Sequence, residues 1–107
     1  MELLKFEFSG HIAPLRPVRG NAFAGVVSSG SLEVLIESVD LGGRCQVEVK
    51  TSASGFRSTW AAVLEEFFAR NKFADIKISI NDFGATPAVV SLRLDQAAAE
   101  IMDLGTK

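Results

Sequence analysis

The sequence predicts an α+β fold, with a mainly antiparallel β-sheet, one long helix packed on a face of the sheet and a short C-terminal helix. Several short segments alternate apolar and polar residues, which is the spacing of half-buried strands, whereas one longer segment has the spacing of an amphipathic helix. The order of these segments is typical of α+β proteins. At 107 residues, of which 48% are hydrophobic, the chain is expected to form one domain, 1–107, with its own core.

The first part of the chain is predicted to contain three strands. Residues Glu2–Phe8 alternate apolar and charged side chains, and Gly10–Gly20 is predicted to be a loop because it contains two prolines. Residues Asn21–Val27 and Leu32–Val39 have strand patterns, and the small, polar Ser28–Ser31 segment between them is a turn by composition. These two strands and their turn predict a β-hairpin.

The middle of the chain is predicted to change from strand to helix. A glycine turn at Leu41–Arg44 leads into a further strand, Cys45–Thr51. Residues Arg57–Lys72 then have helical spacing, because large apolar side chains recur at Trp60, Val63, Leu64, Phe67 and Phe68. We interpret this apolar face as core and not as a cofactor site.

The last part is predicted to be a pair of strands followed by a short helix. Residues Ile76–Ile80 alternate, and Asn81–Pro87 has the composition of a turn or bulged loop. Residues Ala88–Leu94 place apolar side chains two apart, which favours a partner strand. Asp95 is a candidate N-cap for the short helix, Gln96–Leu104.

Composition and charge exclude several classes of function. The formal net charge is -2 and the basic residues are scattered, so nucleic acid is not expected as a partner, because phosphate binding needs clustered Lys and Arg. No apolar run approaches the roughly 20 residues of a membrane span, and the start of the chain lacks the basic region of a signal peptide. A single cysteine, Cys45, cannot form an internal disulfide, and a cytoplasmic location is expected. With one histidine, His11, and no visible ligand cluster, no metal site is predicted.

Three possible chemical sites have a simpler structural interpretation. Cys45 and His11 are a conceivable nucleophile and base, but no third group to orient them is evident, and we favour a buried cysteine and a loop histidine. The glycines of Gly25–Gly30 have phosphate-loop spacing, yet Ser31-Leu32 replaces the required Lys-Ser/Thr and a strand follows. Asp82 is a candidate acid–base residue, but its Asn-Asp-Phe-Gly context is better explained by turn chemistry, in which Asp accepts backbone hydrogen bonds.

The predicted turn Ser28–Ser31 has two interpretations. It is either an ordinary polar hairpin tip or a site of covalent modification, and composition alone leaves both open. An exposed serine hydroxyl on a flexible tip can enter the active site of another enzyme, and Gly30 removes side-chain bulk beside it. Nothing local activates the hydroxyl, so the modifying enzyme would have to supply the base.

Several blocks of the sequence resemble a known family. The segment Gly25–Leu35 (Gly-Val-Val-Ser-Ser-Gly-Ser-Leu-Glu-Val-Leu) resembles the prosthetic-group segment of the malonate decarboxylase acyl carrier proteins, or delta subunits. The family pattern there reads Gly-Val-Val-Gly-Ser-Gly-Asp, an apolar residue and Glu-Val-Leu. The resemblance spans about Phe8 to Glu100. It includes the block Asn81–Pro87 with Val89, Arg93, Leu94 and Gln96, and a looser match at Thr51-Ser52 and the helix with Trp60.

The resemblance implies an attachment residue and a prosthetic group. The family's modified serine falls on Ser29, which would be joined by a phosphodiester to 2'-(5''-phosphoribosyl)-3'-dephospho-coenzyme A. Ser28 replaces the family's glycine before that serine, and Ser31 replaces its aspartate. Because both replacements add hydroxyl groups nearby, Ser28 stays as the less favoured attachment residue.

The resemblance also implies a carrier function without catalysis by the chain itself. An acyltransferase subunit would exchange an acetyl group on the thiol of the arm for malonyl, and decarboxylase subunits would then remove carbon dioxide and regenerate the acetyl thioester. A separate loading enzyme would attach the prosthetic group. The expected role of the chain is tethering, which raises the effective concentration of the acyl group at each partner site.

Alternatives lie within and outside this class. The acyl carrier chain of citrate lyase uses the same arm, but the Asp-Phe-Gly-Ala-Thr-Pro stretch favours the malonate enzyme, and the Asp-Ser-Leu motif of a four-helix acyl carrier protein is absent. An interaction module without cofactor would show an intact mass without adduct, and a stand-alone enzyme would show activity of the unmodified chain. The arm is anionic, so Arg16, Arg19 and Arg44 are candidate contacts, with solvated surface arginines as the equal alternative.

Overall fold

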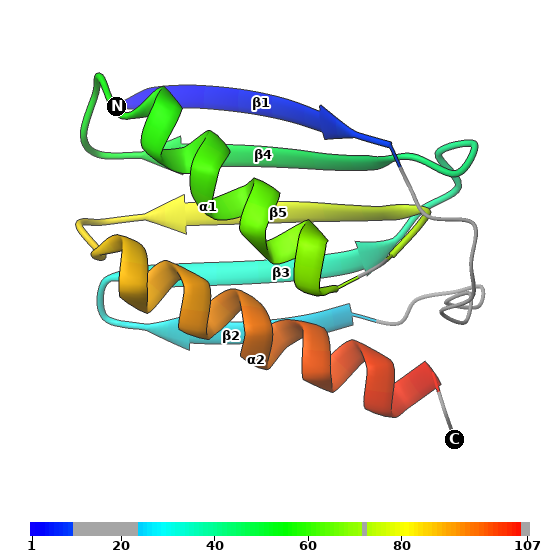
Figure 1. The fold of residues 1–107 in the computed structure, drawn as a ribbon. Coiled ribbons are helices and arrows are strands. Elements are labelled where there is room, and N and C mark those ends of the chain that lie inside the picture. Colours follow the sequence, from blue (N-terminus) through cyan, green and yellow to red (C-terminus); the bar gives the residue numbers. More distant parts are fainter. Residues whose placement is uncertain (10–23, 72, 106–107) are drawn as a thin grey trace.

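The described residues form a five-stranded sheet and two helices (Figure 1). The structure, a computed structural model, describes residues 1–9, 24–71 and 73–105, with the backbone alone for residues 24–29 and 101–105. The predicted loop Gly10–Gly20 lies outside this part of the chain. The elements follow in the order β1 (Glu2–Phe8), β2 (Ala24–Ser29), β3 (Leu32–Ser38), β4 (Cys45–Thr51), α1 (Arg57–Arg70), β5 (Ile76–Asp82) and α2 (Pro87–Gly105).

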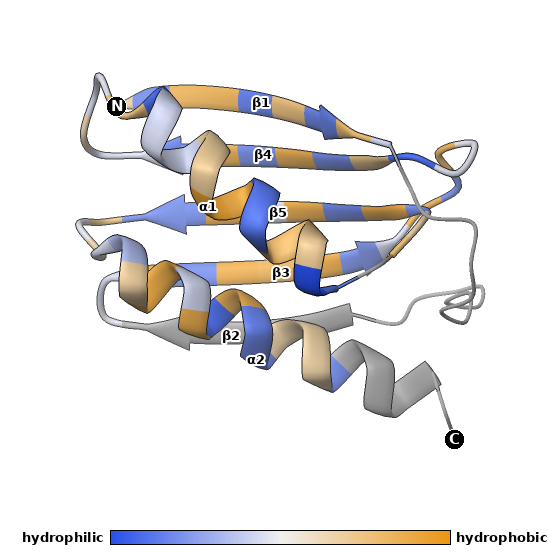
Figure 2. Ribbon diagram, in the orientation of Figure 1, coloured by the Kyte–Doolittle hydropathy of each residue, from blue (hydrophilic) through white to orange (hydrophobic). Residues whose placement is uncertain are grey.

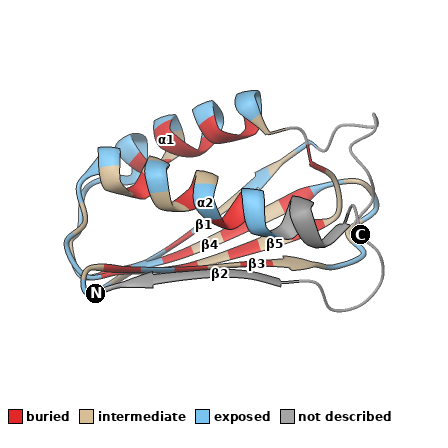
Figure 3. Cartoon of the chain, turned by 90° about the horizontal axis from the view of Figure 1, so that it is seen from below, coloured by how far each residue is buried: buried red, intermediate tan, exposed pale blue. Residues whose placement is uncertain are grey.

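The sheet is mixed, with one parallel pair. Its strand order is β1-β4-β5-β3-β2, and neighbouring strands are antiparallel except β4 and β5. A parallel pair needs a crossover connection, and α1 provides it between these two strands. Both helices lie on the same face of the sheet, with α2 over β2 and β3 (Figures 1 and 3). The α+β prediction with a mainly antiparallel sheet is confirmed.

The core lies between the sheet and the two helices. Strands β3, β4 and β5 bury every second side chain, and these are mostly the apolar ones (Figures 2 and 3). Phe67 of α1 packs edge-on against Phe68, whose ring centroid also lies 4.7 Å from that of Phe8 in β1. The residues predicted as the core face of the helix are all buried: Trp60, Val63, Leu64, Phe67 and Phe68.

The predicted strand Ala88–Leu94 is wrong, because these residues belong to α2. A strand would bury side chains two apart, but Leu92 is 51% exposed. The buried side chains instead follow the helical spacing i, i+4, i+7 and i+8: Val90, Leu94, Ala97 and Ala98. Over the seven residues of the predicted strand, the apolar pattern is compatible with both periods, and packing against the sheet selects the helix.

The predicted short C-terminal helix is also wrong in its length and its cap. At 19 residues α2 is longer than the 14-residue α1. Thr86, and not Asp95, caps α2, because its Oγ1 accepts the backbone N–H of Val89 at 3.3 Å. Proline at the next position suits the first turn of a helix. Asp95 lies inside α2 and forms a salt bridge with Arg70 of α1 at 3.2 Å, which joins the two helices.

Candidate functional site

The predicted hairpin is confirmed, and its turn is shorter than predicted. Strands β2 and β3 pair as far as Ser29 and Leu32, so Gly30 and Ser31 alone form the turn. Ser28 and Ser29 are therefore the last two residues of β2 and not part of the turn. Gly30 is exposed, and a Cβ added to it would meet no atom within 4 Å. The backbone next to Ser29 is thus open to solvent on the turn side.

Ser29 is the last member of a row of residues that crosses the whole sheet. The strand registers align Ser29 of β2 with Leu32 of β3, Asp82 of β5, Thr51 of β4 and Glu2 of β1. We call these five residues the end row. Because neighbouring strands lie about 4.8 Å apart, the backbones of Ser29 and Asp82 are about 10 Å apart.

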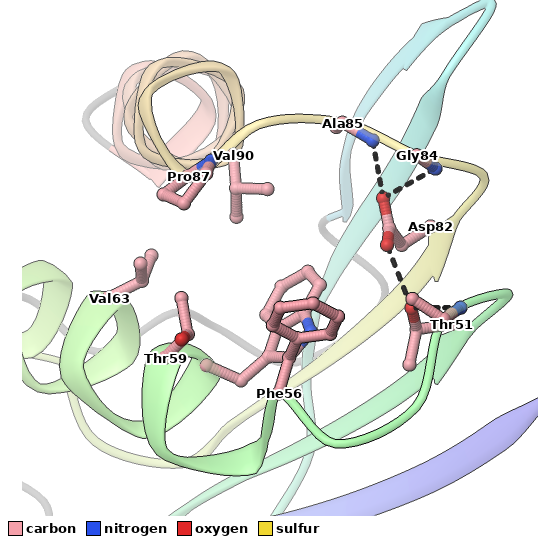
Figure 4. A pocket seen from close by; sticks show the side chains of 11 residues that line it. Thr51, Phe56, Thr59, Val63, Asp82, Gly84, Ala85, Pro87 and Val90 are labelled. Atoms are coloured by element: carbon pink, nitrogen blue, oxygen red, sulfur yellow. Dashed lines mark hydrogen bonds between the residues drawn. The ribbon is translucent and has the colours of Figure 1, made fainter.

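Asp82 joins three segments at this end of the sheet. Its carboxylate Oδ1 accepts the backbone N–H groups of Gly84 at 3.1 Å and Ala85 at 2.8 Å, and Oδ2 accepts the Thr51 hydroxyl at 2.8 Å (Figure 4). The next residue, Phe83, donates its N–H to the carbonyl oxygen of Ser31 in the hairpin turn at 2.9 Å. Gly84 has a φ of 114°, which glycine alone adopts without strain. The prediction that Asp82 accepts backbone hydrogen bonds of a turn is confirmed, but Asn81 and Asp82 themselves belong to β5, so the predicted turn Asn81–Pro87 begins two residues too early.

A cleft of about 400 Å³ opens next to the end row, between the first turns of α1 and α2. Phe56, Thr59 and Trp60 line it from α1 and the residue before it, and Pro87 and Val90 line it from α2 (Figure 4). This cleft was not predicted from the sequence, because Trp60 was interpreted as core alone and the segment around Val90 as a strand. The Thr-Pro pair that starts α2 was the available signal, since it is typical of a helix N-terminus.

The other candidate residues lie elsewhere or outside the described part of the chain. Cys45 is buried at the opposite end of β4, six residues along the strand from Thr51 or about 20 Å away. Arg44 lies beside it and pairs with Glu7 at 3.2 Å, so it is not near Ser29. His11, Arg16 and Arg19 are outside the described residues.

The Cys45 thiol is expected to be unreactive toward thiol reagents in the folded chain. Burial raises its pKa to about 11, although the backbone hydrogen bond of Ile76 lowers it in part and the Asp75 charge adds a smaller increase. Since the thiolate is the reactive form, an aromatic disulfide reagent should label Cys45 only after denaturation. The measurement is the labelling time course with and without urea. Rapid labelling of the folded chain would contradict the buried position.

The same thiol is expected to make stability fall at high pH. Because its pKa in the folded chain is about 11 and its ordinary value is 9.0, the unfolded chain ionises first. The free energy of unfolding should therefore fall between pH 9 and pH 11, by up to about 2–3 kcal/mol. Urea unfolding across this pH range measures the fall, and the Cys45→Ala variant should show a flatter profile. Equal slopes for the two chains would refute this assignment.

Among the described residues, no group of three or more His, Cys, Asp and Glu side chains is placed to hold a metal ion. In the same part of the chain, neither helix has the length and apolar character needed to cross a membrane.

Comparisons with known proteins agree with one another. The family model of the malonate decarboxylase delta subunit matches residues 19–101. The malonate decarboxylase acyl carrier protein of Xanthomonas campestris pv. campestris (strain B100) is 54% identical over 97 residues, which are 91% of each chain. That of Stenotrophomonas maltophilia (strain K279a) is 50% identical over 102 residues, 95% of each chain. A chain in the crystal structure of a Pseudomonas malonate decarboxylase hetero-tetramer in complex with malonate is 40% identical, with a TM-score of 0.77 over 94% of this chain and 99% of that one.

These matches decide between the alternatives that the sequence left open. They cover most of the chain and all point to the malonate enzyme, so they favour it over the citrate lyase carrier chain, a cofactor-free interaction module and a stand-alone enzyme. The chain therefore belongs to the malonate decarboxylase delta subunit family, the acyl carrier proteins of that enzyme, and is a carrier and not a catalytic subunit.

Proposed function

We propose that this chain carries acetyl and malonyl groups for malonate decarboxylase as thioesters on a phosphoribosyl-dephospho-coenzyme A group, which is esterified to Ser29. The observation that carries the proposal is the position of Ser29, at the end of β2 and next to the exposed Gly30 of a two-residue turn. The family's modified serine falls on the same residue. Membership in a family of acyl carrier proteins supports the presence of a covalently bound group.

The residues around Ser29 fit such a group. A loading enzyme must bring its own base to the serine, so the serine needs free space and no activating neighbour. The open space beside the exposed Gly30 meets that requirement. When bound, the group supplies a thiol whose acyl thioester exchanges readily and whose carbonyl delocalises the carbanion left by decarboxylation.

The chain itself contributes a rigid structural support and a fixed attachment point for the arm. The hydrogen bond between Ser31 and Phe83 ties the hairpin turn to β5, and the Asp82 carboxylate ties β5 to β4. An arm fixed at one point can serve an acyltransferase and a decarboxylase subunit in turn, at an effective concentration in the millimolar range. These subunits and a loading enzyme are the proposed partners, and the cytoplasm is the proposed location.

Co-expression with the loading enzymes of a malonate decarboxylase tests the attachment. We expect the intact mass of the wild-type chain to increase by the mass of the prosthetic group. Ser29→Ala should abolish the adduct, and Ser28→Ala should leave it, although Ser28 is the neighbouring residue of the same strand. Full loading of the Ser29→Ala chain together with loss in the Ser28→Ala chain would move the attachment to Ser28.

Enlarging Gly30 is expected to slow loading without unfolding the chain. In Gly30→Leu the new side chain stands next to Ser29, where the loading enzyme must approach. Stability should change by no more than about 0.5 kcal/mol, because Gly30 is exposed, its φ is not positive and no atom lies near its Cβ. The rate of adduct formation, followed by mass, should fall several-fold.

Ala69→Leu is the matched control, since it adds the same side chain at an exposed position of α1. It should load at the wild-type rate. Equal rates for Gly30→Leu and wild type would show that the space beside Ser29 is not needed for loading.

A further inference from the structure

The cleft between α1 and α2 lies at the same end of the sheet as Ser29. Two members of the end row, Asp82 and Thr51, line the cleft (Figure 4). Ser29 is the last residue of that row by strand register. The cleft volume of about 400 Å³ lies within the roughly 300–1,000 Å³ of small-molecule sites. Nothing in the carrier cycle described above requires this cleft.

The cleft walls suit an uncharged chain with both apolar and amide groups. Phe56 on one side faces Val90 on the other, and the exposed Thr59 lies at the rim (Figure 4). Trp60 adds a second aromatic ring to the lining. The Asp82 carboxylate is already satisfied by three donors. Its negative charge repels a phosphate group from the cleft but does not repel an uncharged group.

We propose that this cleft holds the pantetheine end of the prosthetic arm, with its thiol or acetyl thioester, while the arm is not in a partner subunit. This inference rests on the proposed attachment at Ser29. The pantetheine end is the uncharged part of the arm, and it combines two amides with an apolar segment, which matches the walls. The phosphates of the arm stay outside, on the Ser29 side.

The arm is long enough to reach the cleft. Ser29 and Asp82 are about 10 Å apart across two strand spacings, which is less than the length of the dephospho-coenzyme A arm. Gly30 directly follows Ser29 and Gly84 follows Asp82 by two residues. Both glycines are exposed, and a Cβ at either would meet no atom within 4 Å, so neither residue obstructs the arm. Because the tether gives an effective concentration in the millimolar range, even a weak site is largely filled.

The reactivity of the arm's thiol tests the proposal directly. Because Cys45 is buried, an aromatic disulfide reagent reports the arm thiol alone in the loaded, deacylated chain. We expect this thiol to react about tenfold more slowly than coenzyme A in solution, since a millimolar effective concentration and a dissociation constant near 0.1 mM leave about a tenth of the arm free. A rate equal to that of free coenzyme A would overturn the proposal.

Two matched pairs of variants show whether the cleft causes the protection. Phe56→Ala removes an exposed wall of the cleft, and Phe83→Ala removes a similarly exposed ring that lies outside it; the two side chains are 51% and 55% exposed. Thr59→Phe fills the cleft from its rim, and Ser58→Phe adds the same ring at the neighbouring exposed position. Phe56→Ala and Thr59→Phe should react nearly as fast as free coenzyme A, and the two controls should stay slow. Protection that persists in both cleft variants would also overturn the proposal.

Fluorescence provides a second readout and separates the two proposals. Trp60 is the single tryptophan of the chain and lines the cleft, so its emission should differ between the loaded and the unloaded wild-type chain. That difference should vanish in Thr59→Phe. An intact mass without adduct would refute the proposed function itself, whereas a loaded chain with a fully reactive thiol and unchanged Trp60 emission would refute the cleft alone.

Discussion

A malonate decarboxylase complex reassembled with the Ser29→Ala chain is expected to lose malonate turnover by at least about a hundredfold. If the arm is attached at Ser29 as proposed, this chain has no tether, and the acyl group no longer reaches two partner sites at a millimolar effective concentration. The change itself is small and lies next to the exposed Gly30, so the fold should persist. The measurement is the rate of carbon dioxide release from malonate by the reassembled complex, together with the unfolding midpoint of the isolated chain.

Ser28→Ala is the matched control for turnover. It removes a hydroxyl from the adjacent residue of β2 and should leave both the adduct and the rate near the wild-type values. If turnover continues with a Ser29→Ala chain that carries no adduct, the complex does not use a carrier arm at this position.

Removal of the Asp82 carboxylate is expected to cause a large loss of stability. In Asp82→Ala the N–H groups of Gly84 and Ala85 and the hydroxyl of Thr51 lose their acceptor, and the side chain of Asp82 is 5% exposed. An unsatisfied buried polar group costs about 1–3 kcal/mol, and effects within one network are not additive, so we expect a loss of about 2–4 kcal/mol. Urea unfolding measures this loss.

Two further variants serve as references for the loss of stability expected in Asp82→Ala. Glu66→Ala removes a carboxylate from an exposed position of α1 and should change stability by no more than about 0.5 kcal/mol. Thr51→Val removes a single donor to Asp82 together with the acceptor of the Ala53 N–H. Its loss of stability should therefore be larger than that of Glu66→Ala and smaller than that of Asp82→Ala. A loss below about 1 kcal/mol in Asp82→Ala would mean that water replaces the carboxylate.

The strands and α1 were predictable because their patterns are local. Strands β1 and β4 have the bounds that alternation predicts, Glu2–Phe8 and Cys45–Thr51. Helix α1 begins at the predicted Arg57, and the residues of its apolar face are buried as expected. In these segments a single period repeats without interruption, so propensity and packing favour the same structure.

The second helix was not predictable from alternation, since its decisive signals lie outside the apolar run. Thr86 and Pro87 start the helix, and Ala97 and Ala98 extend its buried face beyond the predicted strand. Alanine is a weak marker of burial in a sequence, although it packs closely where α2 lies over the sheet. The predicted cap at Asp95 failed because the helix already begins at Pro87, so Asp95 lies inside α2, where its carboxylate pairs with Arg70 of α1.

The candidate site was predictable only in part, because some of its features depend on tertiary packing and leave no local sequence signal. The hairpin and the turn role of Asp82 follow from short motifs, whereas the cleft depends on how α1 and α2 pack against each other. The end row depends on the register of four strand pairs, and the parallel pairing of β4 with β5 leaves no local signal. The assignment of Ser29 came from resemblance to the family pattern and stays a prediction.

Peptide mass mapping of the wild-type chain, purified after co-expression with the loading enzymes, tests the attachment at Ser29 most directly. Fragmentation of the peptide that contains Ser28 and Ser29 should place the whole prosthetic group on Ser29, linked through a phosphodiester. A prosthetic group on another residue, or a complex that decarboxylates malonate normally while this peptide is unmodified, would contradict it.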